Sequence, residues 1–356
     1  MAGELERCRG EVVLSRVAPG LLSCPGWSLV RALLAGARDE RASAVLAEGG
    51  RGYPLVFARQ LLPGAHRVSI PSIRAGAQTL FEAIAGGLGE GCPWLLHVVP
   101  HYGSGDAGGN RCRLIRAAAL DLLHRRRRGV ERMLGPDAAP FTARHALVQL
   151  LLTTPDAGLL SVAPAPMPHG LRAAMSPFPK GNVPVARDLG APCRAFAKLV
   201  EAERRLGRCI RLGETCVDLG ASPGSWTRLA LERGAAVVAV DRAPLRADLM
   251  GKPRLRYVEG DAFSYQPERS VDWLLCDVVA APERSVELLV RWAREGLMRQ
   301  FVVTVKFKGE AAYGQLEVLK EALWALTEEL HVLRLCANKN EACAFGVVRQ
   351  GPDLAC

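Results

Sequence analysis

Hydrophobic residues in the second half of the chain recur in short runs of strand length, separated by segments with helical spacing. The runs that predict strands are 215–219, 236–240, 255–259, 273–277, 301–306, 332–335 and 342–348. The segments that predict helices are 226–232, 282–296 and 312–329. This alternation favours an α/β fold with a mostly parallel, doubly wound sheet, helices on both faces and right-handed crossovers.

The first half has a less regular pattern of the same kind. Strands are expected at 11–14, 54–62 and 93–100, helices at 28–38, 75–86 and 112–128, and a glycine-rich loop at 102–110. Prolines and glycines gather at 164–187, which indicates a domain boundary. We therefore expect an N-terminal segment 1–60, a second module 61–170, a linker 171–186 and a C-terminal domain 187–356.

Length and composition narrow the class of protein. A chain of 356 residues is expected to form two or three domains. The longest apolar runs, such as 235–240, have strand length, and the first residues lack a leader pattern, so a soluble protein without a membrane span is expected. Eleven cysteines without a C-x-x-C pair argue against disulfides and zinc, and favour a reducing cytoplasm and no metal.

The net charge of +10 is unevenly placed along the chain. Residues 1–180 hold 21 Lys and Arg against 13 Asp and Glu, and residues 181–356 hold 25 against 23. A basic excess in the first half predicts contact with a polyanion, although a merely solvated basic surface stays open. The best candidates for phosphate contact are Arg125, Arg126, Arg127 and Arg128 at a helix end, with Arg59 as a further candidate.

A small-residue loop after the strand 215–219 is the strongest signal of a cofactor. It begins at Gly220, and the residues expected to line the cofactor there are Gly220, Ser222, Pro223, Gly224, Ser225 and Trp226. Pro223 removes a backbone N–H that a dinucleotide pyrophosphate would need, and the loop lacks G-x-G-x-x-G. S-adenosylmethionine therefore fits better than NAD.

Acidic residues follow three of the next strands in order. Asp241 is placed to accept hydrogen bonds from ribose hydroxyls, Asp261 suits an adenine amino group, and Asp277 closes the fourth strand. Ligands collect at the carboxyl ends of parallel strands, although each Asp taken alone could equally cap a helix or form a turn.

Lysine is rare in this chain, which has 39 arginines and 7 lysines. Arg stays protonated, whereas Lys can be made neutral and act as a base. Lys198 lies in a predicted helix before the first strand, Lys306 ends the strand 301–306, and Glu341 follows the strand 332–335. Taken singly, each lysine reads more readily as an exposed solubilising charge.

Together, the order Lys198, Asp277, Lys306 and Glu341 around a D-L-G-x-x-P-G-x-W loop resembles the K-D-K-E tetrad of FtsJ-like ribose 2′-O-methyltransferases. Within them it is most similar to the RlmM-type bacterial enzymes that methylate a 23S ribosomal RNA cytidine. Residues 56–60 and 125–128 resemble that group's N-terminal region, which implies a ferredoxin-like segment followed by a THUMP module. The family's C-P-G-G-W is Ser222-Pro-Gly-Ser-Trp226 here, and the serine expected beside the cofactor is Ala195.

The resemblance implies methyl transfer from S-adenosylmethionine to a ribose 2′-hydroxyl. Lys306 would act as general base, because burial and the charge of Lys198 favour a neutral amine. Asp277 would hold the amine, and Glu341 would orient Lys198 or the target ribose. The expected partner is 23S ribosomal RNA, in an unassembled or protein-poor form.

Three alternatives to a ribose 2′-O-methyltransferase stay open. A base methyltransferase would need an N/D-P-P-Y/F motif or a catalytic Cys, whereas the fourth strand ends Cys276-Asp-Val-Val279. An RNA-binding assembly factor with a weak or inactive methyltransferase domain is the second. The third is a NAD-dependent reductase.

Overall fold

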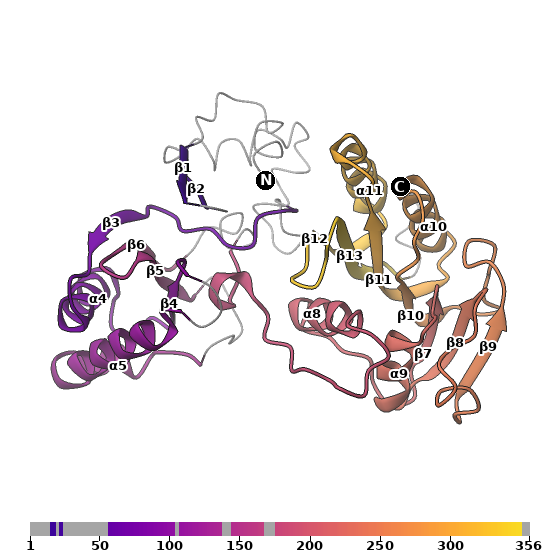
Figure 1. Ribbon diagram of the computed structural model, residues 1–356, viewed down its shortest axis with the longest axis horizontal. Coiled ribbons are helices and arrows are strands. Elements are labelled where there is room, and N and C mark those ends of the chain that lie inside the picture. The colour runs from indigo at the N-terminus through magenta and orange to yellow at the C-terminus, as the bar shows by residue number, and fades with distance from the viewer. Residues whose placement is uncertain are drawn as a thin grey trace. The chain divides into compact units, whose positions relative to one another are not determined.

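The computed structural model describes the backbone of residues 15–18 and 21–23, and residues 56–103, 107–136, 144–166 and 175–350. Contacts divide the chain into two compact units (Figure 1). The first unit comprises 1–49 and 57–182, and the second comprises 50–56 and 183–356. The expected strand at 11–14 and helix at 28–38 lie outside the described residues. Two short strands near them, β1 (Ser15–Ala18) and β2 (Leu21–Ser23), pair antiparallel.

The first unit contains a four-stranded sheet in the order β3-β6-β5-β4. Strands β4 and β5 are parallel, and β6 is antiparallel to both of its neighbours. The strands are β3 (His66–Ser69), β4 (Trp94–Pro100), β5 (Ala146–Thr154) and β6 (Ala157–Ala163), and the helices are α4 (Ile73–Gly87), α5 (Gly109–Arg126), α6 (Arg128–Glu131) and the 3-10 turn η1 (Pro179–Gly181).

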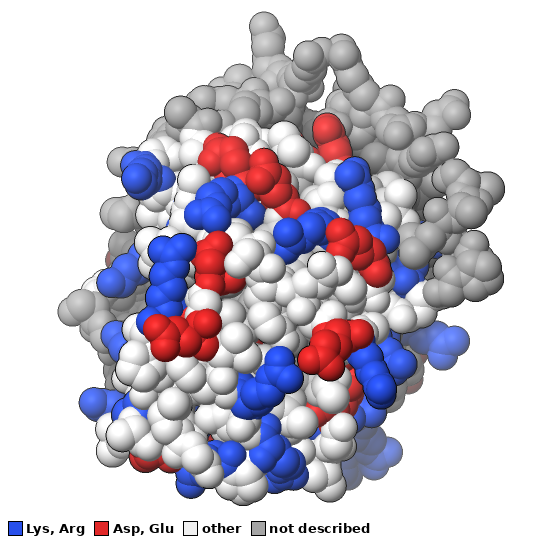
Figure 2. All heavy atoms as spheres, turned by 90° about the vertical axis from the view of Figure 1, so that its right-hand side faces the viewer, with Lys and Arg blue, Asp and Glu red and all other residues white. Residues whose placement is uncertain are grey.

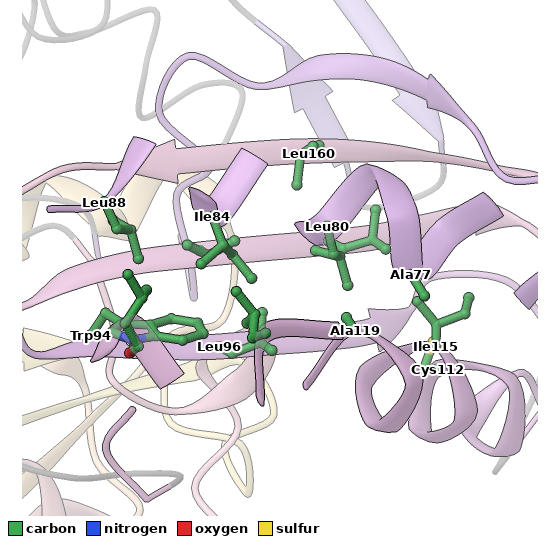
Figure 3. Close-up of a cluster of buried hydrophobic side chains, with 14 of the residues drawn as sticks. Ala77, Leu80, Ile84, Leu88, Trp94, Leu96, Cys112, Ile115, Ala119 and Leu160 are labelled. Atoms are coloured by element: carbon green, nitrogen blue, oxygen red, sulfur yellow. Dashed lines mark hydrogen bonds between the residues drawn. The ribbon is translucent and has the colours of Figure 1, made fainter. Parts of the chain in front are cut away.

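Helices α4 and α5 bury their apolar faces against this sheet (Figure 3). Leu80 and Ile84 on α4, and Ile115 and Ala119 on α5, are one helical turn apart and fully buried. Trp94 at the start of β4 donates its indole N–H to the carbonyl of Val130 at 2.8 Å. The indole polar group is therefore satisfied inside an apolar core.

Several expectations for the first half need correction. The described part of the predicted strand 54–62 is not a strand; Gln60 instead exchanges two side-chain hydrogen bonds of 2.9 Å with the backbone of Ser176. Strands β3, β5 and β6 were not predicted. The predicted helix 112–128 ends at Arg126, because Arg127 leaves the helical conformation with φ −143°, and Arg128 opens α6. The predictions of α4 and β4 are confirmed.

The second unit is a seven-stranded sheet in the order β12-β13-β11-β10-β7-β8-β9. The strands are β7 (Thr215–Leu219), β8 (Ala236–Asp241), β9 (Leu255–Glu259), β10 (Val271–Cys276), β11 (Met298–Lys306), β12 (Thr327–Leu333) and β13 (Glu341–Val348). Strands β11, β10, β7, β8 and β9 pair in parallel, while β13 is antiparallel to both β11 and β12, so six of the seven strands share one direction. The expected doubly wound, mostly parallel sheet is confirmed.

Two pairs of helices pack on this sheet, α8 with α9 and α10 with α11 (Figure 1). The helices are α8 (Phe196–Leu206), α9 (Ser225–Glu232), α10 (Pro282–Arg294), α11 (Gln315–Trp324) and the 3-10 turn η2 (Glu310–Gly314). The predicted helix 312–329 was too long, because β12 already begins at Thr327. Glu341, expected one residue before the predicted strand 342–348, is the first residue of β13.

Charges on the second unit are mixed. Figure 2 views the protein from the side of β8 and β9, where basic and acidic side chains intermingle. This agrees with the near balance of 25 basic and 23 acidic residues over 181–356. Within the described ranges, no helix combines the length and apolar character needed to cross a membrane.

Candidate active site

Four charged side chains from four different elements meet at the carboxyl edge of the second unit's sheet. Lys198 lies on α8, Asp277 follows β10, Lys306 ends β11 and Glu341 begins β13. Because β13 runs antiparallel to β11, its first residue lies at the end of β11, and Lys306 and Glu341 are direct cross-strand partners. The sheet topology thus brings together four residues separated by up to 143 positions in the chain (198 to 341).

Lys198 lies between two carboxylates. Its Nζ donates to Oδ2 of Asp277 at 2.8 Å and to Oδ1 at 3.0 Å, and lies 2.7 Å from Oε1 of Glu341. Only 9% of its side chain is exposed. This amine is enclosed and fully partnered.

Lys306 is placed differently in the same cluster. Its Nζ lies 3.0 Å from Oδ1 of Asp277, donates to the Asp277 carbonyl at 3.1 Å, and lies 3.8 Å from Oε2 of Glu341. Its side chain is 22% exposed, more than twice the fraction for Lys198. Lys306 is the lysine that a substrate hydroxyl can approach.

Charge pairing outweighs burial in this cluster. Burial by itself lowers the pKa of Lys198, but the charges and hydrogen bonds of Asp277 and Glu341 raise it above its ordinary value. Burial raises the pKa of Asp277, but the charges of Lys198 and Lys306 bring it below its ordinary value. Asp277 is therefore a carboxylate and Lys198 an ammonium at neutral pH.

Two buried polar residues that sequence analysis missed hold the carboxylates. Thr304 donates its hydroxyl to Oδ1 of Asp277 at 2.7 Å, and Asn338 donates its amide to Oε1 of Glu341 at 3.0 Å. Thr304 lies two residues before Lys306 on the same strand, so strand periodicity places both on one face. That alternation was a usable signal, whereas nothing in the sequence marks Asn338.

The loop between β7 and α9 depends on two glycines. Gly220 has φ 72° and Gly224 has φ 107°, both in the left-handed region. A Cβ on Gly220 would meet the Val278 side chain at 2.4 Å, and one on Gly224 would meet Leu249 at 2.3 Å. Only glycine at these two positions therefore lets the backbone of the loop lie so close to its neighbours.

Asp241 braces the same loop from the end of β8. Its Oδ2 accepts from the backbone N–H of Ser222 at 2.9 Å, and its Oδ1 accepts from that of Ala243 at 2.9 Å. Each carboxylate oxygen keeps a further lone pair, which suits the ribose hydroxyls of a nucleoside. Ser222 donates its hydroxyl to the Pro244 carbonyl at 3.0 Å, and Pro223 is exposed.

Ser225, Trp226 and Ala195 join α9 to the segment that precedes Lys198. The buried hydroxyl of Ser225 accepts from the N–H of Cys193 at 2.9 Å. The Trp226 indole donates to the Ala195 carbonyl at 2.7 Å. These three predicted cofactor residues are engaged in packing α9 against α8.

Asp261 is engaged by arginines. Arg242 donates to its Oδ1 at 2.9 Å, and Arg284 lies 3.7 Å from Oδ2 with its guanidinium 3.9 Å above the Phe263 ring. An amino group approaching Asp261 would share this carboxylate with Arg242.

A fifth carboxylate, missed in the sequence, lies within β7. Asp218 is 2% exposed and accepts the Thr227 hydroxyl at 2.6 Å. Burial raises the pKa of Asp218 to about 7, and the charges of Asp277 and Asp241 act in the same direction. A charged residue inside an otherwise apolar strand was the signal that could have identified it.

The predicted RNA-binding arginines lie in the first unit and not in this cluster. Arg59 donates to the side chain of Asn182 at 3.3 Å. Arg125 pairs with Asp121 at 2.7 Å, Arg126 lies 5.6 Å above the Phe81 ring, Arg127 is half-buried at the junction of α5 and α6, and Arg128 is exposed. The four consecutive arginines thus have four different environments.

The residues fit S-adenosylmethionine as the cofactor. The glycine turn supplies a close backbone approach, and carboxylates suited to a nucleoside stand at the end of β8 (Asp241) and after β9 (Asp261). Over the described part of the chain, no group of three or more His, Cys, Asp and Glu is placed to hold a metal ion.

A parallel-rich Rossmann-like sheet with this glycine turn and these strand-end acids defines an S-adenosylmethionine-dependent methyltransferase. Residues 191–331 match the model of the FtsJ-like methyltransferase family. A Halorhodospira halophila protein named Ribosomal RNA large subunit methyltransferase M is 32% identical over 278 residues, 76% of this chain and 74% of that protein. The chain belongs to this family of large-subunit ribosomal RNA methyltransferases.

Two further relatives carry the same name. The Laribacter hongkongensis protein is 36% identical over 182 residues, 48% of this chain and 52% of its own length. The Azoarcus sp. (strain BH72) protein is 27% identical over 301 residues, 82% of this chain and 78% of its own length.

Proposed function

We propose that this protein transfers a methyl group from S-adenosylmethionine to the ribose 2′-hydroxyl of a cytidine in 23S ribosomal RNA. The observation that carries the proposal is the Lys306 amine, partly exposed and 3.0 Å from the Asp277 carboxylate at the carboxyl edge of the sheet. A base at this edge is what removal of a hydroxyl proton requires. The names of the relatives support ribosomal RNA as the substrate.

The residues divide the work as follows. S-adenosylmethionine, when bound, supplies a methyl group on a sulfonium, which is already electrophilic. Lys306 accepts the proton of the 2′-hydroxyl, and Asp277 holds its amine in place through Oδ1 and the backbone carbonyl. Lys198 holds Asp277 and Glu341 in place, since it contacts both, and its charge keeps Asp277 ionised. Catalysis then consists of alignment and proton acceptance.

The alternative base-methylating activity has little support in the site. Cys276, the cysteine nearest the Asp277 cluster in sequence, is fully buried, and burial raises the pKa of its thiol to about 12. A thiol of this kind is a poor nucleophile. The lysine cluster favours a hydroxyl as the methyl acceptor.

The first unit serves, in this proposal, to bind RNA. Residues 61–170 would form the THUMP-like module after a ferredoxin-like segment 1–60, with 171–186 as linker and 187–356 as methyltransferase domain. Exposed Arg59, Arg125, Arg126 and Arg128, with half-buried Arg127, would contact phosphates. The substrate would be unassembled 23S RNA in the cytoplasm.

Labelled S-adenosylmethionine and protein-free 23S RNA test the proposal, with the methylated nucleoside identified by mass spectrometry. The expected product is 2′-O-methylcytidine. A DNA copy of the same sequence is the matched control, because it lacks the 2′-hydroxyl, and it should accept no methyl. Methyl on a base would contradict the lysine mechanism. RNA binding without any transfer would favour an assembly factor with an inactive methyltransferase domain.

A further inference from the structure

Thr304 is a fully buried polar residue at the centre of the cluster. It lies on β11 two residues before Lys306 and has no exposed surface. Its hydroxyl lies 2.7 Å from Oδ1 of Asp277 and 3.4 Å from the carbonyl of Cys276. A hydroxyl has one proton to donate, and the shorter contact to the charged acceptor is the stronger one.

Oδ1 of Asp277 accepts hydrogen bonds from Lys198 and Thr304 and forms an ion pair with Lys306. Lys198 and Lys306 each lie 3.0 Å from it, and the Thr304 hydroxyl is nearer than both. Oδ2 is engaged by Lys198 at 2.8 Å. Thr304 is the uncharged member of this set, and it withdraws negative charge from the oxygen that faces Lys306.

The charged groups around Asp277 come from four elements. Lys198 and, further along α8, Glu201 paired with Arg205 lie on one side, and Lys306 lies on β11. Glu341 comes from β13, beside the buried Cys343 thiol. Asp218 on β7 adds a like charge when it is ionised.

The balance among these groups depends on Thr304. Burial raises the pKa of Asp277, and the two lysines together with the Thr304 hydrogen bond bring it below its ordinary value. Without the hydroxyl, the Asp277 carboxylate would lose the donor that fixes the direction of Oδ1, the oxygen that lies 3.0 Å from Nζ of Lys306.

We propose that Thr304 is a positioning residue whose hydroxyl fixes Oδ1 of Asp277, the carboxylate oxygen that holds the Lys306 amine. This inference rests on the proposed role of Lys306 as the base. Thr304 touches neither substrate nor cofactor in this account and acts through Asp277 alone.

A purely structural role has a matched control in the same sheet. Thr327, at the start of β12, is also fully buried and donates its hydroxyl to the Leu323 carbonyl at 2.9 Å. Thr304→Val and Thr327→Val therefore remove the same atoms from equally buried sites. Only the first loses a contact with the cluster.

The test measures the rate of single-turnover methyl transfer to protein-free 23S RNA. Thr304→Val should lower this rate by about tenfold or more, because the carboxylate that places the base is no longer fixed. Thr304→Ser keeps the hydroxyl and should restore most of the rate, and Thr327→Val should retain the wild-type rate.

A second readout does not need the substrate. The carboxyl ¹³C signal of Asp277 should titrate at higher pH in Thr304→Val than in the wild type, because the hydrogen bond that favours the charged form is lost. Thr304→Ala replaces Thr304→Val if the latter does not fold.

The outcomes are distinguishable. A wild-type rate of methyl transfer in a folded Thr304→Val or Thr304→Ala enzyme overturns the inference and leaves the proposed function standing. An equal loss of rate in Thr327→Val shows a general effect of destabilisation and also overturns the inference. If the wild type transfers no methyl, the proposed function fails, and an unmoved Asp277 carboxyl signal then rejects the role of Thr304 independently.

Discussion

Lys198 and Lys306 reach the same oxygen atom, since the Nζ atoms of both lie 3.0 Å from Oδ1 of Asp277. Their surroundings nevertheless differ. Lys198 has a second carboxylate at 2.7 Å and is 9% exposed, whereas Lys306 has its second carboxylate at 3.8 Å and is 22% exposed. We infer that Lys198 stabilises the cluster and that Lys306 accepts the substrate proton.

Replacing Lys198 with Met should destabilise the fold. The change leaves Lys306 as the remaining cation of the cluster beside the carboxylates of Asp277 and Glu341. Removing one partner of a buried pair costs about 3 kcal/mol of unfolding free energy. Urea denaturation at pH 7.5 measures this. Lys320→Met is the control. It removes an ion pair with the exposed carboxylate of Glu317 and should lower the free energy of unfolding by less than about 0.5 kcal/mol.

The loss of stability caused by Lys198→Met should become smaller at acid pH. The pKa of Lys198 is raised and that of Asp277 is lowered, so the pair's contribution is fully present between about pH 5 and 9. Below about pH 4 the carboxylates gain protons and the deficit should shrink. A deficit that grows with acid would contradict the pairing.

Asp218→Asn should make stability less dependent on pH. Burial raises the pKa of Asp218 to about 7, so the native state binds a proton that the unfolded state has lost, and wild-type stability falls between about pH 4 and 7. The neutral amide removes this slope and can still accept the Thr227 hydroxyl. At pH 8 the variant should be more stable by about 1 to 2 kcal/mol.

Urea midpoints at pH 5, 6, 7 and 8 check the Asp218 prediction. Asp272→Asn is the control, because Asp272 is a partly exposed carboxylate in the neighbouring strand β10. If the stability of Asp218→Asn falls with pH as steeply as that of the wild type, Asp218 is not the cause of the pH dependence.

Asp241→Asn should weaken binding of S-adenosylmethionine by about tenfold or more. Both carboxylate oxygens accept backbone N–H groups, from Ser222 and Ala243, so an amide NH₂ must face one of these donors. The glycine turn would lose its brace, and a ribose would lose an acceptor. Calorimetric titration measures the affinity; Asp248→Asn, whose exposed carboxylate pairs with Arg246, should bind normally. Equal affinities for the two variants would remove Asp241 from the cofactor site.

Replacing Arg125 and Arg128 together with Gln should weaken RNA binding without altering cofactor affinity. Each lost phosphate contact should also lower the slope of log K against log salt by about 0.7 to 0.9. Filter binding at several salt concentrations tests this. The double variant Arg256→Gln and Arg299→Gln, both exposed in the second unit, is the control. An unchanged slope in the first variant would place the RNA elsewhere.

The second unit was more predictable from sequence than the first. Parallel strands buried on both faces read as largely apolar runs, and β7 was predicted with its observed bounds. The bounds of the partly buried edge strand β9 were also predicted as observed. In the first unit β5 is just as apolar, but it joins β4 and β6 by pairings that no local pattern reveals. The end of α11 was misjudged because Thr327–Leu333 has apolar residues compatible with either a helix or a strand.

The site residues that could be predicted were acids at the ends of strands and lysines, which are rare in this chain. Glu341 became a neighbour of Lys306 only through the antiparallel β13, and the register of that strand is a tertiary property. Asn338 acts through a loop, and no spacing identifies it. The roles of Ser225 and Trp226 as links to Cys193 and Ala195 likewise depend on how two helices pack.

The measurement that tests the central claim most directly is single-turnover methyl transfer to protein-free 23S RNA by the wild type and by Lys306→Arg. Arginine keeps the positive charge and cannot act as a base. The account predicts 2′-O-methylcytidine from the wild type and a rate lower by about 10² to 10⁴ in the variant, with cofactor and RNA affinities unchanged. A Lys306→Arg rate within tenfold of the wild type would contradict the role of Lys306 as the base.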